Sequence, residues 1–455
     1  MAIHSKEKAI HHHHRPLGFW PPGHRKRVLQ SVASKADEVK RADHVPLDPT
    51  RVAFQQVVND TPSLKERANK MFTESSNHFD PTERPAITNF NQFLHVVNSI
   101  ITTGPPFYDK DETAMGLLGF PINAVLDWPM GTLSGVEFWL HSAANASFKC
   151  VLNTWGSWLK SNKSQSGLKD WLSPDALGLL ANAALGKDFS SIFECDPSQP
   201  YYGFDSWDDL FTREFKEGQR PVFRPYFQPF ADGDPDPSLF ITNACESAPL
   251  QVAYNVQLFD NFWLKGQPYS LVNTLNNNSK ASQFVGGTVY QAFLSARSYH
   301  RWHAPISGKV VNIEQVPGTY YAENYFEGLA GNPNGPDPAA PNYSQPYISA
   351  VATRGIIYIE AENSKIGLMA IVFIGMAEVS SCEFTVKPGD TIHKGQQIGM
   401  FHFRGSSHCM VFRPGVEMTF EPPPKDWNMD TEKNNKVNSL LAKIHQSSEE
   451  RMFFL

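Results

Sequence analysis

Phe401-His402-Phe403-Arg404-Gly405-Ser406-Ser407, near the C-terminus, closes a segment whose pattern indicates strand, turn and strand. A Gly-Ser bond in a tight turn is a place where a chain can cut itself, because Gly405 has no side chain to shield its carbonyl from the hydroxyl of Ser406. The attack gives an ester by an N-to-O acyl shift, and elimination then converts Ser406 into a pyruvoyl group. Such a ketone forms a Schiff base with a substrate amine and accepts electrons as a carboxylate leaves, the role otherwise played by pyridoxal phosphate. Gly-Ser-Ser is also an ordinary turn composition, so other parts of the chain must support this hypothesis.

Four further motifs precede this one in a fixed order. They are Phe211-Thr212-Arg213-Glu214-Phe215-Lys216 with Arg220-Pro221, Tyr299-His300-Arg301-Trp302-His303-Ala304-Pro305-Ile306-Ser307-Gly308, Val316-Pro317-Gly318-Thr319-Tyr320 and Phe373-Ile374-Gly375-Met376. With these five motifs the chain resembles the phosphatidylserine decarboxylase family of self-processing, pyruvoyl-dependent enzymes. The resemblance implies an α+β fold, with an N-terminal helical cap on a C-terminal catalytic core of β-sandwich or barrel-like form.

A narrower resemblance concerns the substrate. It is carried by Asn153-Thr154-Trp155-Gly156-Ser157-Trp158-Leu159, Tyr201-Tyr202-Gly203-Phe204-Asp205-Ser206, Cys245-Glu246-Ser247 and Lys265-Gly266-Gln267-Pro268-Tyr269-Ser270-Leu271. These segments are similar to the fungal branch that decarboxylates free aromatic L-amino acids, which includes the tryptophan decarboxylases of psilocybin biosynthesis. The resemblance implies that tryptophan, tyrosine or phenylalanine gives the arylethylamine and CO2 through a Schiff base on the pyruvoyl group of Ser406, without pyridoxal phosphate.

Self-cleavage needs a base that takes the proton of Ser406 and a carboxylate that orients this base. By resemblance, His303 falls on the triad histidine of the family. Glu246 stands where the family usually has an aspartate, and its extra methylene moves the carboxylate by about 1.5 Å. The resemblance assigns to His300 the protonation of the substrate carbon after CO2 has left, a task that suits an acid of neutral range. Since no third or fourth ligand accompanies the two histidines, we predict no metal site.

Four aromatic residues beside these positions are candidates for stacking an aromatic substrate, although aromatic residues beside buried strands more often belong to the core. They are Tyr299, Trp302, Phe401 and Phe403. Arg354 matches a family motif at its arginine alone, which leaves open whether it binds a carboxylate.

The composition limits the partners. A net charge of −6 over 455 residues provides no basic field for nucleic acid. The longest apolar runs are too short to cross a bilayer, and the N-terminus lacks the apolar core of a signal peptide. Five cysteines without paired spacing suit a reducing compartment. We therefore expect a cytoplasmic protein without stable membrane insertion, whose two chains stay associated after a cut between residues 405 and 406.

Three regions follow from the texture of the chain. Residues 1–60, which include His11 to His14, are polar without a sustained period and predict a flexible arm. Residues 61–200 predict an α-helical domain, in which apolar residues recur at helical spacing from Ile87 to Ile100 and Ser173-Pro174-Asp175 starts a helix. Residues 201–455 predict the β-rich catalytic domain, with strands at 356–360, 367–374 and 386–400. Segments 304–310 and 386–396 resemble the two halves of a lipoyl-type barrel and are expected to serve as framework.

Two other functions remain open from the sequence. A phosphatidylserine decarboxylase that makes phosphatidylethanolamine would share every catalytic residue. A non-catalytic β-sandwich binding protein could keep the motifs as framework.

Overall fold

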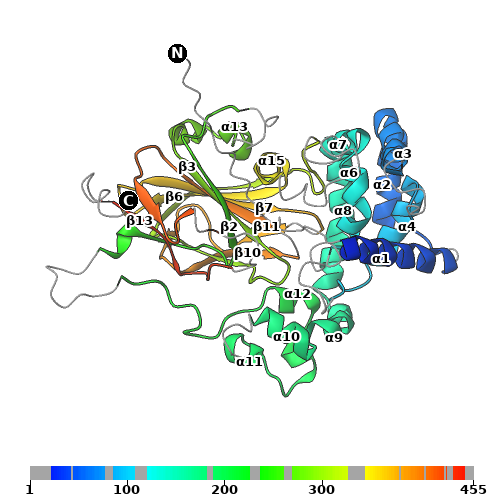
Figure 1. The fold of residues 1–455 in the computed structure, drawn as a ribbon, viewed down its shortest axis with the longest axis horizontal. Helices are drawn as coiled ribbons and strands as arrows, with labels where there is room; N and C mark the ends of the chain where they lie inside the picture. The colour runs from blue at the N-terminus through cyan, green and yellow to red at the C-terminus, as the bar shows by residue number, and fades with distance from the viewer. Residues whose placement is uncertain are drawn as a thin grey trace, which may run out of the picture.

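The computed structural model joins a helical region to a β-rich region (Figure 1). The structure describes residues 22–42, 45–76, 86–107, 120–181, 188–225, 236–260, 269–325, 344–378, 381–403, 406–424, 427 and 434–445. The predicted α+β fold is confirmed. No helix among these residues is long and apolar enough to cross a membrane.

The helical region begins with α1 (Pro22–Arg41), α2 (Pro49–Asp60), α3 (Pro62–Ser76) and α4 (Phe90–Ile100). It continues with α6 (Pro121–Met130), α7 (Leu133–Leu140) and α8 (Ser142–Leu159), and then with the shorter η1 (Asn162–Gly167), α9 (Leu168–Trp171), α10 (Pro174–Leu180), α11 (Phe189–Ile192), η3 (Pro200–Gly203) and α12 (Trp207–Phe211). The two helices predicted from spacing and caps are present. The Asn89 side chain accepts from Gln92 N at 3.0 Å to start α4, and Ser173 caps α10 at Ala176 N, 3.3 Å away.

The expectation of a flexible arm up to residue 60 is wrong for α1 and α2. Asp48 caps α2 by accepting from Thr50 N at 2.9 Å, and Phe54 and Val58 are buried against the other helices. Only these two of the apolar residues of α2 are buried, and its other apolar residues, Val52, Ala53 and Val57, obscure the buried face in the sequence; neighbouring helices supply the rest of the core. His11 to His14 lie outside the described residues.

The β-rich region is built on one seven-stranded antiparallel sheet. Its order is β2 (Ala248–Tyr254), β3 (Thr288–Leu294), β11 (Ser406–Phe412), β7 (Leu368–Gly375), β6 (Arg354–Ala361), β5 (Gly308–Val316) and β9 (Thr391–Ile392). One three-stranded sheet contains β4 (Arg301–His303), β10 (Gln397–His402) and β8 (Ser381–Phe384), and another contains β1 (Phe240–Thr242), β13 (Leu440–Ile444) and β12 (Met418–Phe420). Two of the predicted strands correspond to β6 and β7, whereas the segment 386–400 divides into β9 and the start of β10 around a turn.

Both faces of the large sheet are covered. One face packs under α13 (Leu271–Thr274), η5 (Ala281–Phe284) and α15 (Gln345–Val351). The other face shares a core with the two small sheets, through residues such as Phe373, Trp302 and Leu441. Burial on both sides explains why every residue of β7 is buried and why its sequence is continuously apolar.

The two half-motifs meet in space. Ala304 N donates to Gln396 O at 2.8 Å, and Gly395 N donates back to Ala304 O at 2.8 Å. β5 and β9 then pair antiparallel, Gly308 opposite Ile392. The two half-motifs thus hold the small sheet of β4 and β10 against the edge of the large sheet, and so serve as framework.

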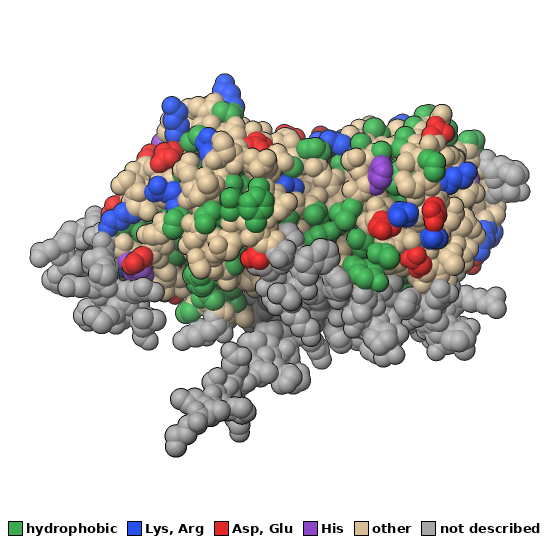
Figure 2. All heavy atoms as spheres, turned by 90° about the horizontal axis from the view of Figure 1, so that it is seen from above, with side chains coloured by type: hydrophobic (Ala, Val, Ile, Leu, Met, Phe, Trp, Pro, Cys, Tyr) green, Lys and Arg blue, Asp and Glu red, His purple; other side chains and the backbone are tan. Residues whose placement is uncertain are grey.

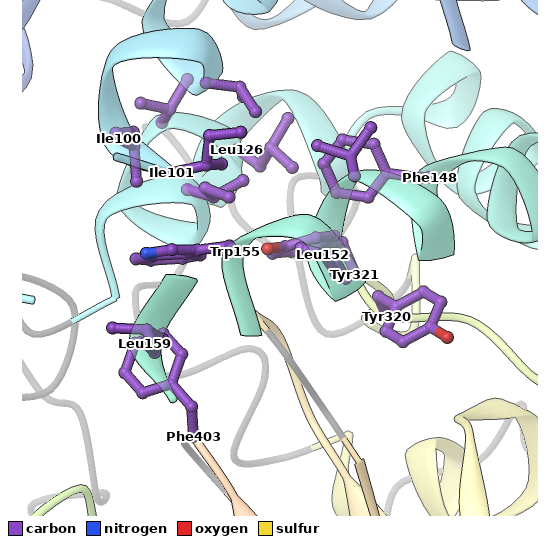
Figure 3. Close-up of a cluster of buried hydrophobic side chains, with 14 of the residues drawn as sticks. Ile100, Ile101, Leu126, Phe148, Leu152, Trp155, Leu159, Tyr320, Tyr321 and Phe403 are labelled. Carbon is purple, nitrogen blue, oxygen red and sulfur yellow. The ribbon is translucent and has the colours of Figure 1, made fainter. Parts of the chain in front are cut away.

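The helical and β-rich regions share side-chain contacts. Figure 3 shows Trp155 and Leu159 of α8 in one cluster with Tyr320, Tyr321 and Phe403 of the β-rich region. Glu378, fully buried, accepts from Ile122 N at 3.0 Å and Asn123 N at 3.2 Å at the start of α6. The division at residues 60 and 200 stays a prediction, and one apolar core crosses both boundaries.

The surface carries both signs of charge. On the face that Figure 2 draws, Lys and Arg side chains lie among Asp and Glu side chains, and apolar patches lie between them. This mixture agrees with the small net charge of the chain.

Candidate active site

Ser406 is the first residue of β11, the third strand of the large sheet. It pairs with Leu294 at the end of β3 and with Gly375 at the end of β7. Its side chain is fully buried, and within the part of the chain that the structure describes its Oγ has no hydrogen-bond partner. Leaving a buried hydroxyl unpaired costs about 1–3 kcal/mol, so such a group calls for an explanation. One explanation is that Ser406 is a nucleophile whose Oγ meets its partner only during the reaction. Gly405 lies outside the described residues.

The backbone just before this bond is held in an unusual conformation. Phe403 has a φ of 29°, in the left-handed region that costs a non-glycine residue about 1–2 kcal/mol. Its ring packs edge-on against Trp155 at 4.8 Å and Trp207 at 4.6 Å between centroids. Figure 3 shows Phe403 reaching from the strand end into the helical cluster. Apolar packing therefore stabilises a strained residue two positions before Gly405.

His303 ends β4 with both ring nitrogens engaged. Nδ1 lies 2.8 Å from the carbonyl oxygen of Gly395, and Nε2 lies 3.1 Å from the hydroxyl of Tyr299. A carbonyl only accepts, so Nδ1 carries the proton, and Nε2 accepts from Tyr299. Burial lowers the pKa of His303, and the Gly395 carbonyl and the charge of Glu246 oppose this only in part. His303 is thus a neutral imidazole with its lone pair on Nε2, the form that a general base requires.

Glu246 is engaged elsewhere. Arg220 donates to its carboxylate from Nε at 3.0 and 3.1 Å, and Val437 N donates at 2.7 Å. The guanidinium also lies 4.1 Å from the ring centroid of Phe215. No hydrogen bond joins Glu246 to His303 in the described structure, so its effect on the base is electrostatic. The orienting acceptor of His303 is instead a backbone carbonyl. The assignment of Glu246 to the triad stays a prediction.

His300 is fully buried and lies flat against Phe211, with ring centroids 3.9 Å apart. Its carbonyl accepts from Phe401 N at 2.9 Å, which ties it to the strand that leads to Ser406. Neither ring nitrogen has a hydrogen-bond partner of normal geometry among the described residues. Burial first, and then the charge of Arg213, hold the pKa of His300 well below 6.5. His300 must therefore take up a proton before it can act as the predicted donor.

The four aromatic candidates are all buried. Trp302 stacks on Phe373 at 3.7 Å, and Phe401 meets its edge at 4.7 Å, inside the core of the large sheet. Phe403 lies in the helical cluster, and Tyr299 contacts Phe215 as well as His303. A role for any of them in a substrate pocket stays a prediction.

Arg354 serves the framework. Its guanidinium donates to the carbonyls of Thr274 at 3.0 Å, Ala352 at 2.8 Å and Asn273 at 2.6 Å. All three nitrogens are thus used by backbone, which leaves a bound carboxylate little to pair with. Among the described residues, no group of His, Cys, Asp and Glu side chains could hold a metal ion.

Sequence reasoning missed His402, the last residue of β10. Its Nδ1 lies 2.9 Å from Asp208 Oδ2, and its Nε2 lies 2.8 Å from Glu383 Oε2 and 3.5 Å from Lys160 Nζ. The sequence offered one signal for this residue, its closeness to the cleavage site, since His402 stands four residues before Ser406. Its partners come from α12, from β8 and from the residue that caps the end of α8, which only the fold brings together.

Comparison with known proteins identifies the family of the chain. The phosphatidylserine decarboxylase family matches residues 207–436, and a second phosphatidylserine decarboxylase segment matches residues 48–180. Decarboxylase iboD of Amanita muscaria is 38% identical over 366 residues, which cover 77% of this chain and all of that protein. L-tryptophan decarboxylases of Psilocybe cubensis and Psilocybe cyanescens are 37% and 39% identical, over 71% and 66% of this chain and 73% and 69% of those proteins. Phosphatidylserine decarboxylase proenzymes of Schizosaccharomyces pombe and Bacillus cereus match at 25% and 29% identity over 50% and 45% of this chain.

The resemblance read from five motifs is thereby confirmed over most of the chain. Both the β-rich region and the helices before it are matched, and the family segment 207–436 includes the positions of His303 and Ser406. The chain belongs to the phosphatidylserine decarboxylase family.

Proposed function

We propose that this chain is a self-processing, pyruvoyl-dependent decarboxylase of free aromatic L-amino acids. The observation that carries the proposal is the buried Ser406 Oγ, which follows Gly405 directly and has no hydrogen-bond partner among the described residues. Enzymes of the family are in general pyruvoyl-dependent, and a free, buried hydroxyl at a strand start fits the residue from which such a group is made. Among the described residues no hydrogen bond competes for the Oγ, and the carbonyl it would attack belongs to the preceding residue of the chain.

Maturation proceeds through the chain's own atoms. His303 Nε2 takes the proton of Ser406 as Oγ attacks the Gly405 carbonyl carbon, and the C–N bond breaks as that proton passes to the amide nitrogen. β-Elimination then releases Gly405 as a carboxylate and leaves a dehydroalanine. Water hydrolyses its imine tautomer, ammonia departs, and residue 406 becomes the pyruvoyl group. The strained Phe403 and the neutral His303 favour the first of these steps.

In the mature enzyme the pyruvoyl ketone supplies the electron sink for loss of CO2. His300 directly precedes β4, and its carbonyl accepts from Phe401 N at 2.9 Å, which ties it to β10, the strand that leads toward Ser406. Its lowered pKa means that it holds a proton only briefly, which suits transfer to a strongly basic carbon.

The substrate class rests on the relatives. Two of them are named L-tryptophan decarboxylases and share 37% and 39% identity, whereas the phosphatidylserine decarboxylase proenzymes share 25% and 29% over a smaller part of this chain. A free aromatic amino acid is therefore favoured over phosphatidylserine, which remains the alternative.

After cleavage the two pieces stay together. β11 begins at the new end and pairs along all seven of its residues with both β3 and β7. The cut removes one peptide bond and none of these pairs.

A mass spectrum of the purified protein tests maturation. A cut after residue 405 of 455 gives pieces of 405 and 50 residues, the smaller one blocked at its N-terminus by pyruvoyl. Ser406→Ala is the matched control and should give one inactive chain. An intact mass of the unprocessed chain, in protein that still releases CO2, would contradict the proposal, and an intact, inactive wild type would favour the non-catalytic binding protein.

Turnover tests the substrate. Tryptophan, tyrosine or phenylalanine should release CO2 without added pyridoxal phosphate, and borohydride should attach the substrate amine to the 50-residue piece. Turnover of phosphatidylserine vesicles with none of the free amino acids would instead support the alternative.

A further inference from the structure

His402 occupies a site that the reaction described above does not use. It lies at the end of β10, where Asp208 of α12, Glu383 of β8 and Lys160, the C-cap residue of α8, meet. His402 and Asp208 are buried, and the Glu383 side chain is 52% exposed. Asp208, Glu383 and Lys160 are the charged groups that face the ring among the described residues.

The distances fix the charge of the ring. Both ring nitrogens face carboxylate oxygens, at 2.9 Å on one side and 2.8 Å on the other. An ionised carboxylate only accepts, so each nitrogen must donate, and a ring that donates from both nitrogens is an imidazolium. Lys160 Nζ, at 3.5 Å, is the more distant contact and opposes this charge. Burial alone lowers the pKa of His402, but the hydrogen bond and charge of Asp208 outweigh it, and the pKa lies above 6.5.

The position of the ring gives this charge a consequence. His402 is the last residue of β10, and Phe403 follows it in a strained backbone conformation. Ser406, three residues after Phe403, begins β11. The imidazolium joins the strand end to α12, whose Trp207 also packs on Phe403. Loss of its proton removes at least one of the two charge-assisted hydrogen bonds that fix this end of the turn.

We propose that the protonated His402, held between Asp208 and Glu383, is a positioning residue for self-cleavage at Ser406. This inference rests on the proposed function, because it concerns the same cut. The inference means that self-cleavage slows above a certain pH. The titration of the base His303 alone would not cause this slowing.

The direction of the pH dependence of self-cleavage follows from the pKa shifts of the two histidines. His303 has a lowered pKa, so the base is neutral through the neutral range and is lost only in acid. His402 has a raised pKa, so its contribution is complete in acid and is lost as the pH rises through that value. The rate of self-cleavage should thus pass through a maximum and fall on the alkaline side.

Freshly translated chain, produced in a cell-free system and transferred to buffers from acid to alkaline pH, gives the cleavage rate on denaturing gels. His402→Gln cannot carry the charge and should cut about ten- to hundredfold more slowly, the loss expected for one charge-assisted hydrogen bond. His402→Lys keeps a cation and should restore the rate without the alkaline fall. Asp208→Asn should move that fall to lower pH by roughly one to two pH units. Asp209→Asn is the matched control, since this neighbour on α12 bonds to Asp205 N and not to His402.

A second measurement does not depend on cleavage. NMR follows the titration of His402 in the uncut Ser406→Ala chain. The signal of His402 is the one absent from the His402→Gln spectrum, and its pKa should lie above 6.5. A pKa at or below that value, or one pH profile shared by wild type, His402→Gln and His402→Lys, overturns the inference. A wild-type chain that is never cut at any pH would sink the proposed function instead, and the titration would still report whether the ring is a cation.

Discussion

The pairing of Glu246 with Arg220 predicts that Glu246→Ala weakens the fold as well as the triad. Both side chains are only 10% exposed, and removing one partner of such a pair costs about 3–5 kcal/mol because the other charge is left buried. Val437 N also loses its acceptor. The contact of Arg220 with Phe215 remains and offsets about 0.5–2 kcal/mol, so we expect the lower part of that range.

Thermal unfolding in a Ser406→Ala background measures this loss on a single uncut chain. In a chain of 455 residues each kcal/mol shifts the unfolding midpoint by about 1 °C, so the midpoint should fall by roughly 3 °C or more. Replacing both partners, as Arg220→Met with Glu246→Leu, should recover most of the stability, because apolar groups of similar volume replace a buried pair at little cost. Glu214→Ala is the control, since its carboxylate pairs with Arg301 but is 57% exposed, and should cost less than about 1 kcal/mol.

Cleavage gives the other half of the test. With Ser406 restored, Glu246→Ala should slow self-cleavage less than His303→Ala does, because Glu246 acts on the base from a distance and the Gly395 carbonyl still orients the ring. If Glu246→Ala unfolds at the same temperature as Glu214→Ala while cleavage stops, the reasoning is refuted and Glu246 acts in the chemistry alone.

Three further outcomes are expected. His303→Ala should stay uncut on denaturing gels, whereas His300→Ala should be cut and lose about a hundred- to ten-thousand-fold in turnover, the usual contribution of general acid catalysis; the reverse pattern would exchange the two assignments. Cleavage of the wild-type chain should fall on the acid side only below pH 6.5, because the lowered pKa of His303 keeps the base neutral above it, and an acid limb centred above 6.5 in rate measurements would contradict this. Phe403→Ala should lower the free energy of unfolding by about 3–5 kcal/mol in denaturant titration and slow cleavage, whereas unchanged cleavage would show that the packing of this ring does not position the turn.

Local patterns predicted the parts of the fold that are encoded locally. The apolar spacing around Phe90 and Ile100 gave α4, and the continuous apolar run gave β7, because the number of buried faces sets each pattern. α2 was missed although Asp48-Pro49 is a good start signal, because apolar residues on its exposed side, such as Val52 and Ala53, hide the buried face of Phe54 and Val58.

The site was predicted only in part for a different reason. Ser406 and His303 belong to short motifs and could be found by resemblance. The acceptor that orients His303 is the carbonyl of Gly395, and every residue has a carbonyl, so no side-chain pattern could reveal it. His402 was missed because Asp208 lies 194 residues away along the chain and reaches the ring only through tertiary packing.

The place of β11 inside the large sheet makes the processed enzyme a two-component assembly whose thermal midpoint depends on protein concentration. The 50-residue piece cannot leave without opening the sheet between β3 and β7, so its dissociation and the unfolding of the core are one event. By mass action, dilution should lower the midpoint of the cut protein and leave that of uncut Ser406→Ala unchanged. Self-cleavage thus converts a unimolecular folding equilibrium into a bimolecular one. Before the cut the chain refolds alone, whereas after the cut the two pieces must first meet in solution.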